Sequence, residues 1–312
     1  MQANAIVFQQ PQSLDLGALA LPAMGAEDVL VKVEYTGIST GTERLLWEGT
    51  MPTFPGMGYP LVPGYETVGR VVAAGEKSTV GVGERVYVPG SQCFQDARNL
   101  FGGSASRLVV PAARAMPMAE SLAERGVLFA LAATAHHAHS APGTRQPDLI
   151  VGHGVLGRMI ARLAVLAGHT PVVWDTNPAR RGGAVGYEVI DPASDTRRNY
   201  QCICDVSGVS SLLDDLISRL APGGEVVLAG FYEAPLSFVF PPAFMREARI
   251  RIAAQWSPPD LAAVIAMAGD GRLSLDGLVT HQHEATDADV AYRTAFGDAD
   301  CLKMILDWRH IA

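Results

Sequence analysis

Cysteine is scarce in this chain, with four residues among 312, at positions 93, 202, 204 and 301. They are too few and too scattered for the disulfide framework that stabilises small secreted domains. Cys202 and Cys204 lie two residues apart in a strand-like run, so they share one face of it, and we expect buried free thiols there. This cysteine usage excludes a disulfide-stabilised fold.

Basic residues and long apolar runs are scarce as well. Lysine and arginine total 24 against 32 acidic residues, and the net charge of -8 argues against nucleic acid, because phosphates favour a basic surface. No segment reaches the roughly 18 uninterrupted apolar residues of a membrane span, and the N-terminus lacks the pattern of a signal peptide. We therefore expect a cytoplasmic protein without an integral membrane segment.

Glycine, by contrast, is plentiful, and its most informative cluster lies between residues 148 and 175. A short apolar run ends at Val151 and is followed by Gly152, Gly154 and Gly157, and then by a helical pattern. In such a turn the first glycine bends the chain, the second lets backbone amides approach a pyrophosphate, and the third allows close packing of helix and strand. The free amides at the helix N-terminus then face the phosphates.

The helix after this turn and the acid beyond it complete a dinucleotide-binding pattern. Apolar residues recur at three- and four-residue spacing over 156–167, with Arg158 and Arg162 on the other face. A second strand, 171–174, ends on Asp175, about 20 residues beyond the glycines, where a carboxylate can bond an adenosine ribose 2′-hydroxyl. The pattern predicts NAD as the cofactor. The predicted binding residues are Gly152, Gly154, Val155, Leu156, Gly157 and Asp175.

The first third of the chain is β-rich, and the middle alternates strands and helices. Runs of Val, Ile and Tyr separated by glycine and proline predict a small barrel-like β domain. After a helical stretch at 122–139, alternation of strands and helices predicts a doubly wound parallel sheet over 119–256. The predicted strands of the β domain are 5–8, 28–35, 67–74, 85–89 and 106–111. The last segment has helical patterns at 261–268 and 288–296 and strand-like runs at 279–281 and 303–308.

Short motifs along the whole chain resemble, in their order, those of the medium-chain dehydrogenase/reductase superfamily. They are Gly37-Ile38, Pro63-Gly64-Tyr65-Glu66, Val82-Gly83-Glu84-Arg85-Val86, Thr134-Ala135, the glycine turn, Leu220-Ala221-Pro222-Gly223-Gly224 and Lys303 to Leu306. The resemblance implies an α/β fold with a GroES-like domain, formed by 1–118 and 257–312, and a Rossmann domain over 119–256. It also implies a substrate cleft between the domains, Thr134 at the cofactor, and a homodimer joined near 249–254.

Three positions depart from the zinc-dependent members of this superfamily. Those members carry a cysteine after the Gly-Ile pair, a histidine before the glutamate of a Gly-His-Glu motif, and a third ligand before the Thr-Ala pair. This sequence has Ser39, Tyr65 and Ala130 there, which do not make the thiolate and imidazole shell of catalytic zinc. Of the four cysteines of a structural zinc lobe, only Cys93 lies in the corresponding stretch. The sequence therefore predicts no metal.

Without zinc, the proton of an alcohol substrate must leave through a side chain, since hydride transfer requires the hydroxyl to lose it. Tyr65 and Ser39 stand at zinc-ligand positions, and His136 follows the Thr-Ala pair with an imidazole that titrates near working pH. We predict these three residues as catalytic. Further candidates for the same role are Thr40, Glu43, Glu66 and His137.

The insert after Ser39 resembles that of one branch of the superfamily, the dehydrogenases that act on a hydroxyethyl bacteriochlorophyllide in bacteriochlorophyll biosynthesis. The likeness runs from Ser39 to Gly49 and from Met51 to Pro60. It implies NAD-dependent oxidation of the C3 1-hydroxyethyl group of a chlorin or bacteriochlorin to an acetyl group. Aromatic rings and flexible methionine suit a flat tetrapyrrole. The predicted substrate residues are Trp47, Met51, Phe54 and Tyr59.

Two alternatives remain open at this point. One is another zinc-free member of the superfamily, such as a quinone or enone reductase that uses NADPH or a different secondary-alcohol dehydrogenase. Asp175 and the insert argue against it. The other is a binding protein without enzymatic activity, which the intact glycine turn opposes. Measurements of cofactor preference and of nucleotide binding distinguish these alternatives.

Overall fold

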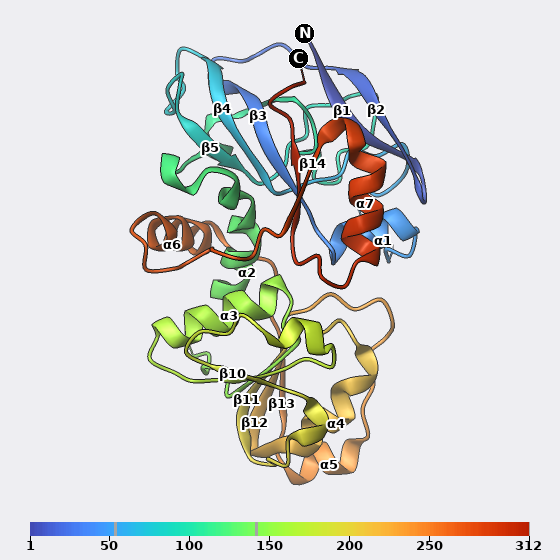
Figure 1. The fold of residues 1–312 in the computed structure, drawn as a ribbon, viewed down its shortest axis with the longest axis vertical. Coiled ribbons are helices and arrows are strands. Elements are labelled where there is room, and N and C mark those ends of the chain that lie inside the picture. The colour runs from blue at the N-terminus through green and yellow to red at the C-terminus, as the bar shows by residue number, and fades with distance from the viewer. Residues whose placement is uncertain (53–54, 141–142, 312) are drawn as a thin grey trace. The chain divides into compact units, whose positions relative to one another are not determined.

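The computed structural model describes residues 1–52, 55–140 and 143–311 of the chain. The chain divides into two compact units, one formed by 1–130 and 275–312 and the other by 131–274 (Figure 1). The first unit is rich in antiparallel strands, and the second contains a parallel sheet with helices. The predicted α/β fold class is confirmed.

The central strand of the first unit is β3 (Asp28–Ile38), which pairs antiparallel with β4, β6 and β15. Its apolar residues at alternate positions, among them Val29, Val31 and Val33, are fully buried, as expected for a strand with one face on the core. β15 brings the C-terminal segment back, with Met304 opposite Ile38. The other strands are β1 (Gln2–Gln10), β2 (Ser13–Ala20), β4 (Thr67–Ala74), β5 (Arg85–Val88), β6 (Arg107–Pro111), β7 (Met116–Pro117), β14 (His281–Glu284) and β15 (Met304–Asp307).

An aromatic cluster joins two helices to the first unit's sheets. The ring of Trp47 stacks on that of Tyr292 at 5.9 Å, and Phe8 meets both rings edge-on at 5.5 and 5.1 Å. Such contacts stabilise a core beyond the area they bury. The helix that carries Tyr292, drawn in red in Figure 1, lies beside β2. The helices are α1 (Thr42–Glu48), α7 (Ala288–Gly297) and the 3-10 segments η1 (Ala112–Arg114), η2 (Glu120–Leu128) and η6 (Ala285–Asp287).

The second unit contains a six-stranded parallel sheet in the order β10-β9-β8-β11-β12-β13. The order reverses at β8, so the chain leaves β8 and β11 toward opposite sides of the sheet. The strands are β8 (Leu149–Val151), β9 (Val172–Trp174), β10 (Glu188–Ile190), β11 (Tyr200–Asp205), β12 (Leu220–Leu228) and β13 (Arg249–Ile252). The helices are α2 (Phe129–Ser140), α3 (Val155–Leu166), α4 (Leu213–Arg219), α5 (Phe240–Met245), α6 (Pro258–Gly269) and the 3-10 segments η3 (Pro178–Arg181), η4 (Pro192–Ser194) and η5 (Ser210–Leu212).

Two segments form structure that their glycines and prolines do not indicate, and one local prediction differs from the structure. The insert after Ser39 holds α1, because Leu46 and Trp47 pack into the core on one helical face and Gly49, at φ 75°, ends the helix. Residues 221–224 lie inside β12, where a register shift opposite β11 takes up the extra residues. The expected helix over 122–139 is broken into η2 and α2, with Ala123 at φ 44°.

The boundaries between the two compact units also differ from the predicted domain boundaries at 118 and 257. η2 belongs to the first unit, because it packs on β3 and β4. α6 belongs to the second, because Asp260 on this helix bonds to side chains of α2. Among the described residues, no helix combines the length and apolar character that crossing a bilayer requires.

Candidate active site

The first unit brings Ser39 and Tyr65 together. Ser39 follows the end of β3, Tyr65 precedes β4, and the backbone amide of Gly37 donates to Glu66 O at 2.8 Å, which keeps the two segments in register. The Tyr65 hydroxyl donates to Ser39 Oγ at 2.6 Å. Two residues that are 26 positions apart in sequence thus form a hydroxyl pair where zinc-dependent relatives are expected to bind metal.

The environment of Tyr65 keeps its phenol protonated. Burial, and then the nearby Glu66 carboxylate, raise the pKa of Tyr65 far above its ordinary value, and hydrogen bonds with Ser39 and Thr42 offset this only in part. The ring packs edge-on against Phe101 at 4.9 Å, so its orientation is fixed. A phenol in this state can pass a proton along a hydrogen bond, but it cannot remain as phenolate at neutral pH.

A buried ion pair lies beside the hydroxyl pair. Lys303 Nζ donates to both carboxylate oxygens of Glu66, at 2.9 and 2.7 Å, and to the carbonyl of Ile38 at 3.1 Å. Both side chains are buried. Gly37 is required here, because a Cβ at this position would lie 2.1 Å from Glu66 Oε2. The pair joins the C-terminal segment to β3, and both Glu66 oxygens accept from the ammonium group.

A second buried acid in the same unit is paired differently. Glu43, in the first turn of α1, accepts a hydrogen bond from the Tyr292 hydroxyl at 2.8 Å through Oε2. Its other oxygen, Oε1, is buried and has no hydrogen-bond partner among the residues that the structure describes. Burial is the main cause that raises the pKa of Glu43 to about 8. Glu43 was a minor candidate from the sequence, and no local signal pointed to Tyr292.

The three positions that would hold zinc do not fit the metal. Ser39 Oγ and the Tyr65 hydroxyl are engaged with each other, and Ala130 offers only a methyl group. Catalytic zinc sites use three side-chain ligands drawn from thiolate, imidazole and carboxylate. In the stretch of the structural lobe, Cys93 is buried, with its sulfur 3.3 Å from Ser91 Oγ. These positions therefore do not supply the ligand set of catalytic zinc.

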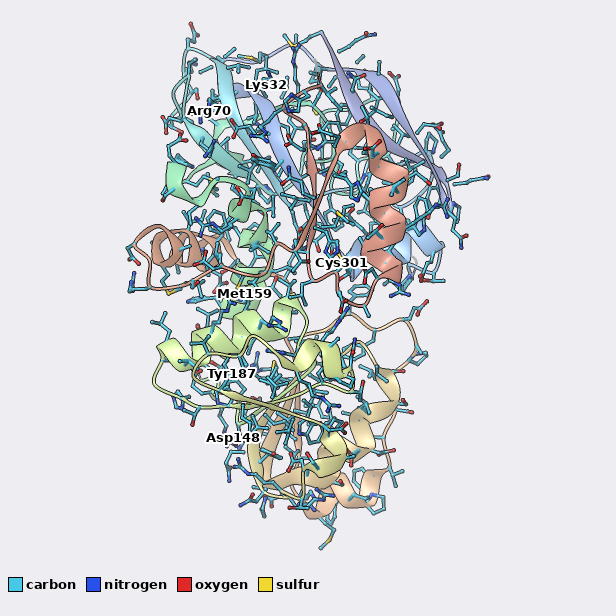
Figure 2. All side chains as sticks on the ribbon, viewed as in Figure 1. Lys32, Arg70, Asp148, Met159, Tyr187 and Cys301 are labelled. Carbon is cyan, nitrogen blue, oxygen red and sulfur yellow. The ribbon has the colours of Figure 1, made fainter. Side chains whose placement is uncertain are left out.

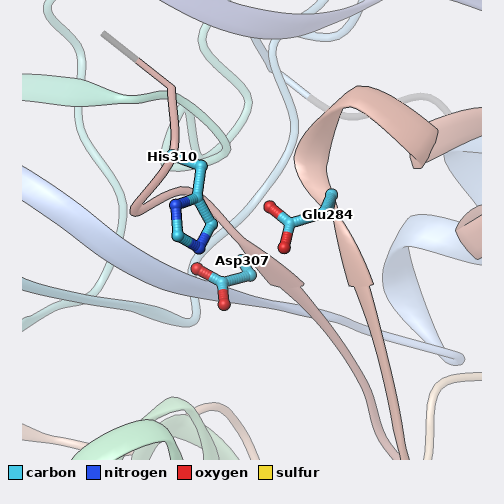
Figure 3. A group of neighbouring side chains, drawn as sticks. All are labelled: Glu284, Asp307 and His310. Atoms are coloured by element: carbon cyan, nitrogen blue, oxygen red, sulfur yellow. The ribbon is translucent and has the colours of Figure 1, made fainter.

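A carboxylate and imidazole group elsewhere in the first unit has a metal-like composition. Glu284, Asp307 and His310 place one potential ligand atom each within 4.8 Å of the others (Figure 3). The Asp307 carboxylate, however, is already bonded by the Arg309 guanidinium, at 2.6 Å to Oδ2, and by Gln282. An arginine at this distance opposes a second cation, so the group is explained by side-chain pairing.

The predicted substrate residues do not lie in one common environment. The expectation for Trp47 is wrong, because the indole is only 5% exposed and stacks in the aromatic cluster; Met51 is likewise a core residue. Phe54 lies outside the described residues. Tyr59 is half-buried, donates its hydroxyl to Leu46 O, and lines an open hollow of about 730 Å³ between the segments 55–60 and 92–100.

The glycine turn in the second unit has the geometry of a phosphate-binding loop. Gly152 has φ 105°, which favours glycine, and a Cβ on Gly157 would lie 1.8 Å from the Gly152 carbonyl oxygen. Gly154 precedes α3, whose first residues are Val155 and Leu156. The turn follows β8, where the strand order reverses, and a crevice at such a switch point is where doubly wound folds bind nucleotides.

Asp175, at the end of β9, is held beside this turn. Its Oδ2 accepts from the backbone amide of His153 at 2.9 Å, and its Oδ1 from that of Asn177 at 2.8 Å. Each carboxylate oxygen keeps a second lone pair, so the acid can still accept from ribose hydroxyls. Arg181 donates to the Asp191 carboxylate and to the backbone carbonyls of Asp175 and Thr176. The turn and the acid fit an adenine dinucleotide.

His153 and Arg158 stabilise the glycine turn through buried hydrogen bonds. His153 bonds Arg180 O at 2.6 Å through Nδ1 and the Tyr187 hydroxyl at 2.8 Å through Nε2. Tyr187 is labelled among the side chains of Figure 2. Burial lowers the pKa of His153 to about 4, so the ring stays neutral. Arg158, expected on the exposed face of its helix, is buried, because its guanidinium donates to the carbonyls of His153 and Arg180.

His136 and His137 bind one carboxylate within the second unit. Their Nδ1 atoms lie 2.7 and 2.8 Å from the two oxygens of Asp260, which also caps α6 through Ser257. Burial would raise the pKa of Asp260, but the hydrogen bonds from Ser257 and both imidazoles outweigh it and hold that pKa well below its ordinary value. His136 thus connects α2 to α6. Thr134 lies two residues before His136 on α2, in the same unit as the glycine turn.

Comparison with known proteins identifies the family. Residues 25–120 match the alcohol dehydrogenase GroES-like domain. The chain is 53% identical to the 2-desacetyl-2-hydroxyethyl bacteriochlorophyllide A dehydrogenase of Rhodobacter capsulatus, over 99% of each chain, and 53% identical to the enzyme of that name from Cereibacter sphaeroides, over 100% of each. The chain belongs to this dehydrogenase family. The predicted membership of the medium-chain superfamily, and of this branch, is confirmed.

The fold of the family is also that of solved alcohol dehydrogenases. The structure of an alcohol dehydrogenase from Escherichia coli CFT073, complexed with the cofactor NADH, superposes with a TM-score of 0.83 over 98% of this chain and 99% of that chain, at 22% sequence identity. At this identity the likeness concerns the fold alone. The family assignment rests on the two full-length relatives.

Proposed function

We propose that this protein oxidises the hydroxyethyl group of a bacteriochlorophyllide to an acetyl group, with NAD as the hydride acceptor. The observation that carries the proposal is the full-length identity of 53% to two dehydrogenases named for that substrate. A bound nicotinamide dinucleotide would supply the hydride acceptor. The residues that would hold it are Gly152, Gly154, Val155, Leu156, Gly157, Asp175 and Thr134.

The hydroxyl pair suits a metal-free oxidation of this substrate. The Tyr65 hydroxyl would bond the substrate hydroxyl and orient it, while Ser39 accepts from Tyr65 and fixes the direction of proton movement. The carbinol carbon is attached to a conjugated macrocycle, which can spread the positive charge that develops as hydride leaves. Less electrophilic assistance is then required from the protein than for a simple alcohol.

The hollow beside Tyr59 is the proposed contact for the macrocycle. Its wall includes Leu100, which in sequence precedes the Phe101 ring that packs on Tyr65. Arg98 also lines it, and its guanidinium makes no hydrogen bond or ion pair with the part of the chain that the structure describes. We expect Arg98→Gln to raise KM for an acidic tetrapyrrole and to leave KM for NAD unchanged, with Arg107→Gln as the control.

NAD is the proposed cofactor because Asp175 would accept from a ribose 2′-hydroxyl and repel a 2′-phosphate. Arg181, which could otherwise attract that phosphate, is paired with Asp191. Asp175→Ser should weaken NAD binding and narrow the preference over NADP. An unchanged ratio of the two dissociation constants would contradict this contact.

The decisive experiment is an assay of the purified protein on hydroxyethyl chlorins and hydroxyethyl bacteriochlorins with NAD and, separately, NADP. We expect the acetyl product with NAD. Reduction of quinones or enones with NADPH, without oxidation of either macrocycle, would favour the other zinc-free branch. Nucleotide binding without turnover of any of these substrates would favour a non-enzymatic role.

We also propose a cytoplasmic homodimer. β13 is an edge strand of the parallel sheet, and it exposes Ile250 and Ile252 close in sequence to the exposed Phe240, Phe244 and Met245 of α5. A patch of this kind is typical of protein interfaces. Ile252→Asp should convert the dimer to a monomer in sedimentation experiments. The four cysteines, all free and buried, are consistent with a reducing compartment.

A further inference from the structure

One residue inside the glycine turn connects the two parts of the proposed NAD site, the phosphate-binding loop and the segment that carries Asp175. This residue is His153, which is fully buried. Its backbone amide donates to Asp175 Oδ2 at 2.9 Å, so the turn itself holds the carboxylate proposed to bind the ribose. The side chain of His153 is not needed for that contact, and it makes two further hydrogen bonds.

The hydrogen bonds of the imidazole fix which nitrogen carries the proton. Nδ1 lies 2.6 Å from the carbonyl oxygen of Arg180, and a carbonyl can only accept, so Nδ1 is the donor. Burial lowers the pKa of His153 to about 4, so the ring is neutral at neutral pH and Nε2 is an acceptor. Burial also raises the pKa of Tyr187, whose protonated hydroxyl donates to Nε2 at 2.8 Å. The hydrogen bonds therefore run in one direction, from Tyr187 through His153 to the backbone at Arg180.

The carbonyl of Arg180 accepts a second hydrogen bond, from Arg158. This arginine, near the start of α3, donates to Arg180 O through Nη2 at 2.9 Å and to His153 O through Nε at 3.0 Å. Its guanidinium is buried and lies against Gly183, where a Cβ would be 2.8 Å from Nη1. One carbonyl oxygen at the end of η3 is thus held by a donor from the glycine turn and by a donor from α3.

η3 is held at its other end by Asp175. The Asn177 side chain caps the first residues of η3, and the Asn177 backbone amide donates to Asp175 Oδ1 at 2.8 Å. The segment 175–181 is therefore fixed at its start by the acid and near its end by His153 and Arg158. These contacts all lie within the second unit.

A fixed segment favours the cofactor that lacks a 2′-phosphate. Asp175 is held in one position, and an acceptor that is already placed costs less ordering entropy when a ribose binds. Arg181 is engaged with the Asp191 carboxylate and with two backbone carbonyls, so it does not supply the cation that a 2′-phosphate requires. If η3 were released, Asp175 would lose its fixed position and the arginines of η3 would be able to approach such a phosphate.

We propose that His153 is a positioning residue that sets the preference for NAD over NADP, because its side chain fixes η3 through the carbonyl of Arg180. This assignment rests on the NAD preference of the proposed function. His153 acts through Asp175, which is the residue proposed to contact the ribose. A purely structural role of His153 would lower the affinities for both dinucleotides alike, whereas the proposed role changes their ratio.

Two amide variants separate the hydrogen bonds of the imidazole. His153→Asn places its amide near the position of Nδ1 and retains a donor for the carbonyl of Arg180, whereas His153→Gln places it near Nε2 and retains only the contact with Tyr187. Calorimetry with the whole protein, without substrate, gives the dissociation constants of NAD and of NADP. His153→Asn should keep their ratio within about twofold of the parent, and His153→Gln should narrow it by about fivefold, the effect of one lost hydrogen bond. His169→Gln, at an exposed histidine of the same unit, is the control and should leave both constants unchanged.

A second pair of variants keeps the assignment testable if His153→Gln does not fold. Arg158→Met removes the other donor to the carbonyl of Arg180 and should narrow the ratio in the same direction. Arg162→Met removes an equal charge from the same helix, at a residue that donates to the carbonyl of Ser274 instead, and should keep the ratio of the parent. Circular dichroism of each variant shows that the constants are measured on folded protein.

Each outcome decides the assignment. An unchanged ratio in folded His153→Gln or in Arg158→Met, whether or not both affinities fall, would overturn it, as would a His153→Asn variant that narrows the ratio as much as His153→Gln. A parent protein that does not prefer NAD would overturn the proposed cofactor and this assignment together. A parent that prefers NAD but oxidises no hydroxyethyl macrocycle would overturn the proposed oxidation and leave the role of His153 intact. The binding and turnover assays thus separate the two failures.

Discussion

Glu43 and Glu66 are two buried carboxyl groups of the same unit, and their partners differ. Glu66 faces an ammonium group that bonds both of its oxygens, whereas Glu43 accepts from the neutral Tyr292 hydroxyl and its other oxygen has no partner in the described part of the chain. A fully paired buried acid has one stable charge state and serves as a structural connection. A partly paired one can change its charge state near neutral pH. The contrast shows that partners as well as burial decide the charge state of an interior acid.

Tyr65 has different partners at its backbone and at its hydroxyl. Its backbone continues directly into Glu66 and so belongs to the connection between β3, β4 and the C-terminal segment. Its hydroxyl donates instead to Ser39. Variants should consequently fail in different ways, in folding at the Glu66–Lys303 pair and in turnover at the Tyr65 hydroxyl.

The largest expected effect is on folding, from Lys303→Met. This change leaves the Glu66 carboxylate buried without a counter-ion, and we expect a loss of about 3–5 kcal/mol in the free energy of unfolding measured in urea. The double variant Glu66→Gln with Lys303→Met should recover most of this loss, because neither charge remains. A Lys303→Met variant as stable as the parent would show that the Glu66–Lys303 pair is not buried in solution.

Tyr65→Phe should affect turnover and spare stability. The ring against Phe101 remains, and only the hydroxyl that donates to Ser39 is lost. We expect kcat to fall by a factor on the order of 10²–10⁴, with KM little changed. If kcat stays within about twofold of the parent, the proton leaves by another route, and His136→Ala becomes the variant to measure.

The third expected effect is a pH dependence of stability that comes from Glu43. The pKa of Glu43 is about 8 in the folded protein against an ordinary value of 4.5, so the folded state binds more protons between these pH values. The stability that protonated Glu43 contributes to the folded state is complete below pH 4.5 and is lost as the pH rises through 8. Relative to Glu43→Gln, the parent should lose stability over this range by up to about 1.4 kcal/mol per pH unit. Parallel curves from urea unfolding would contradict a buried protonated Glu43.

The smallest expected effect is that of a chelator. Ser39, Tyr65 and Ala130 do not provide zinc ligands, so activity should persist after incubation with a strong chelator. Elemental analysis of the purified protein should find no stoichiometric zinc. One zinc per chain, with loss of activity on its removal, would mean that the hydroxyl pair is not the proton path.

Much of the fold could be predicted from local signals. The strand at 67–74 agrees with β4 residue for residue, and the helix predicted over 288–296 ends one residue short of α7. β2, β10 and α5 were not anticipated, because they are short or lack the clear periodicity that marks longer elements. α1 was missed because the surrounding glycines and prolines suggested a loop, while the apolar face that stabilises it packs against Phe8 and Tyr292.

The candidate site was predictable only in part. Ser39 and Tyr65 could be named because family motifs mark both positions, and the structure brings them within a hydrogen bond. Trp47 was misassigned because an aromatic side chain in a glycine-rich insert fits a binding wall as well as a core. Arg158 was misassigned because helical periodicity does not reveal the carbonyls that a neighbouring loop presents to a buried guanidinium.

By itself, the sequence determined the glycine turn with its strand, helix and acid, and the loss of zinc ligands. These features depend on the steric freedom of glycine, on periodicity and on side-chain chemistry, all of which are local. Only the tertiary structure decided which polar groups share the interior. Glu43 and Tyr292 are 249 residues apart and Glu66 and Lys303 are 237 apart. Their charge states follow from burial and from partners, and both arise only when distant strands and helices pack together.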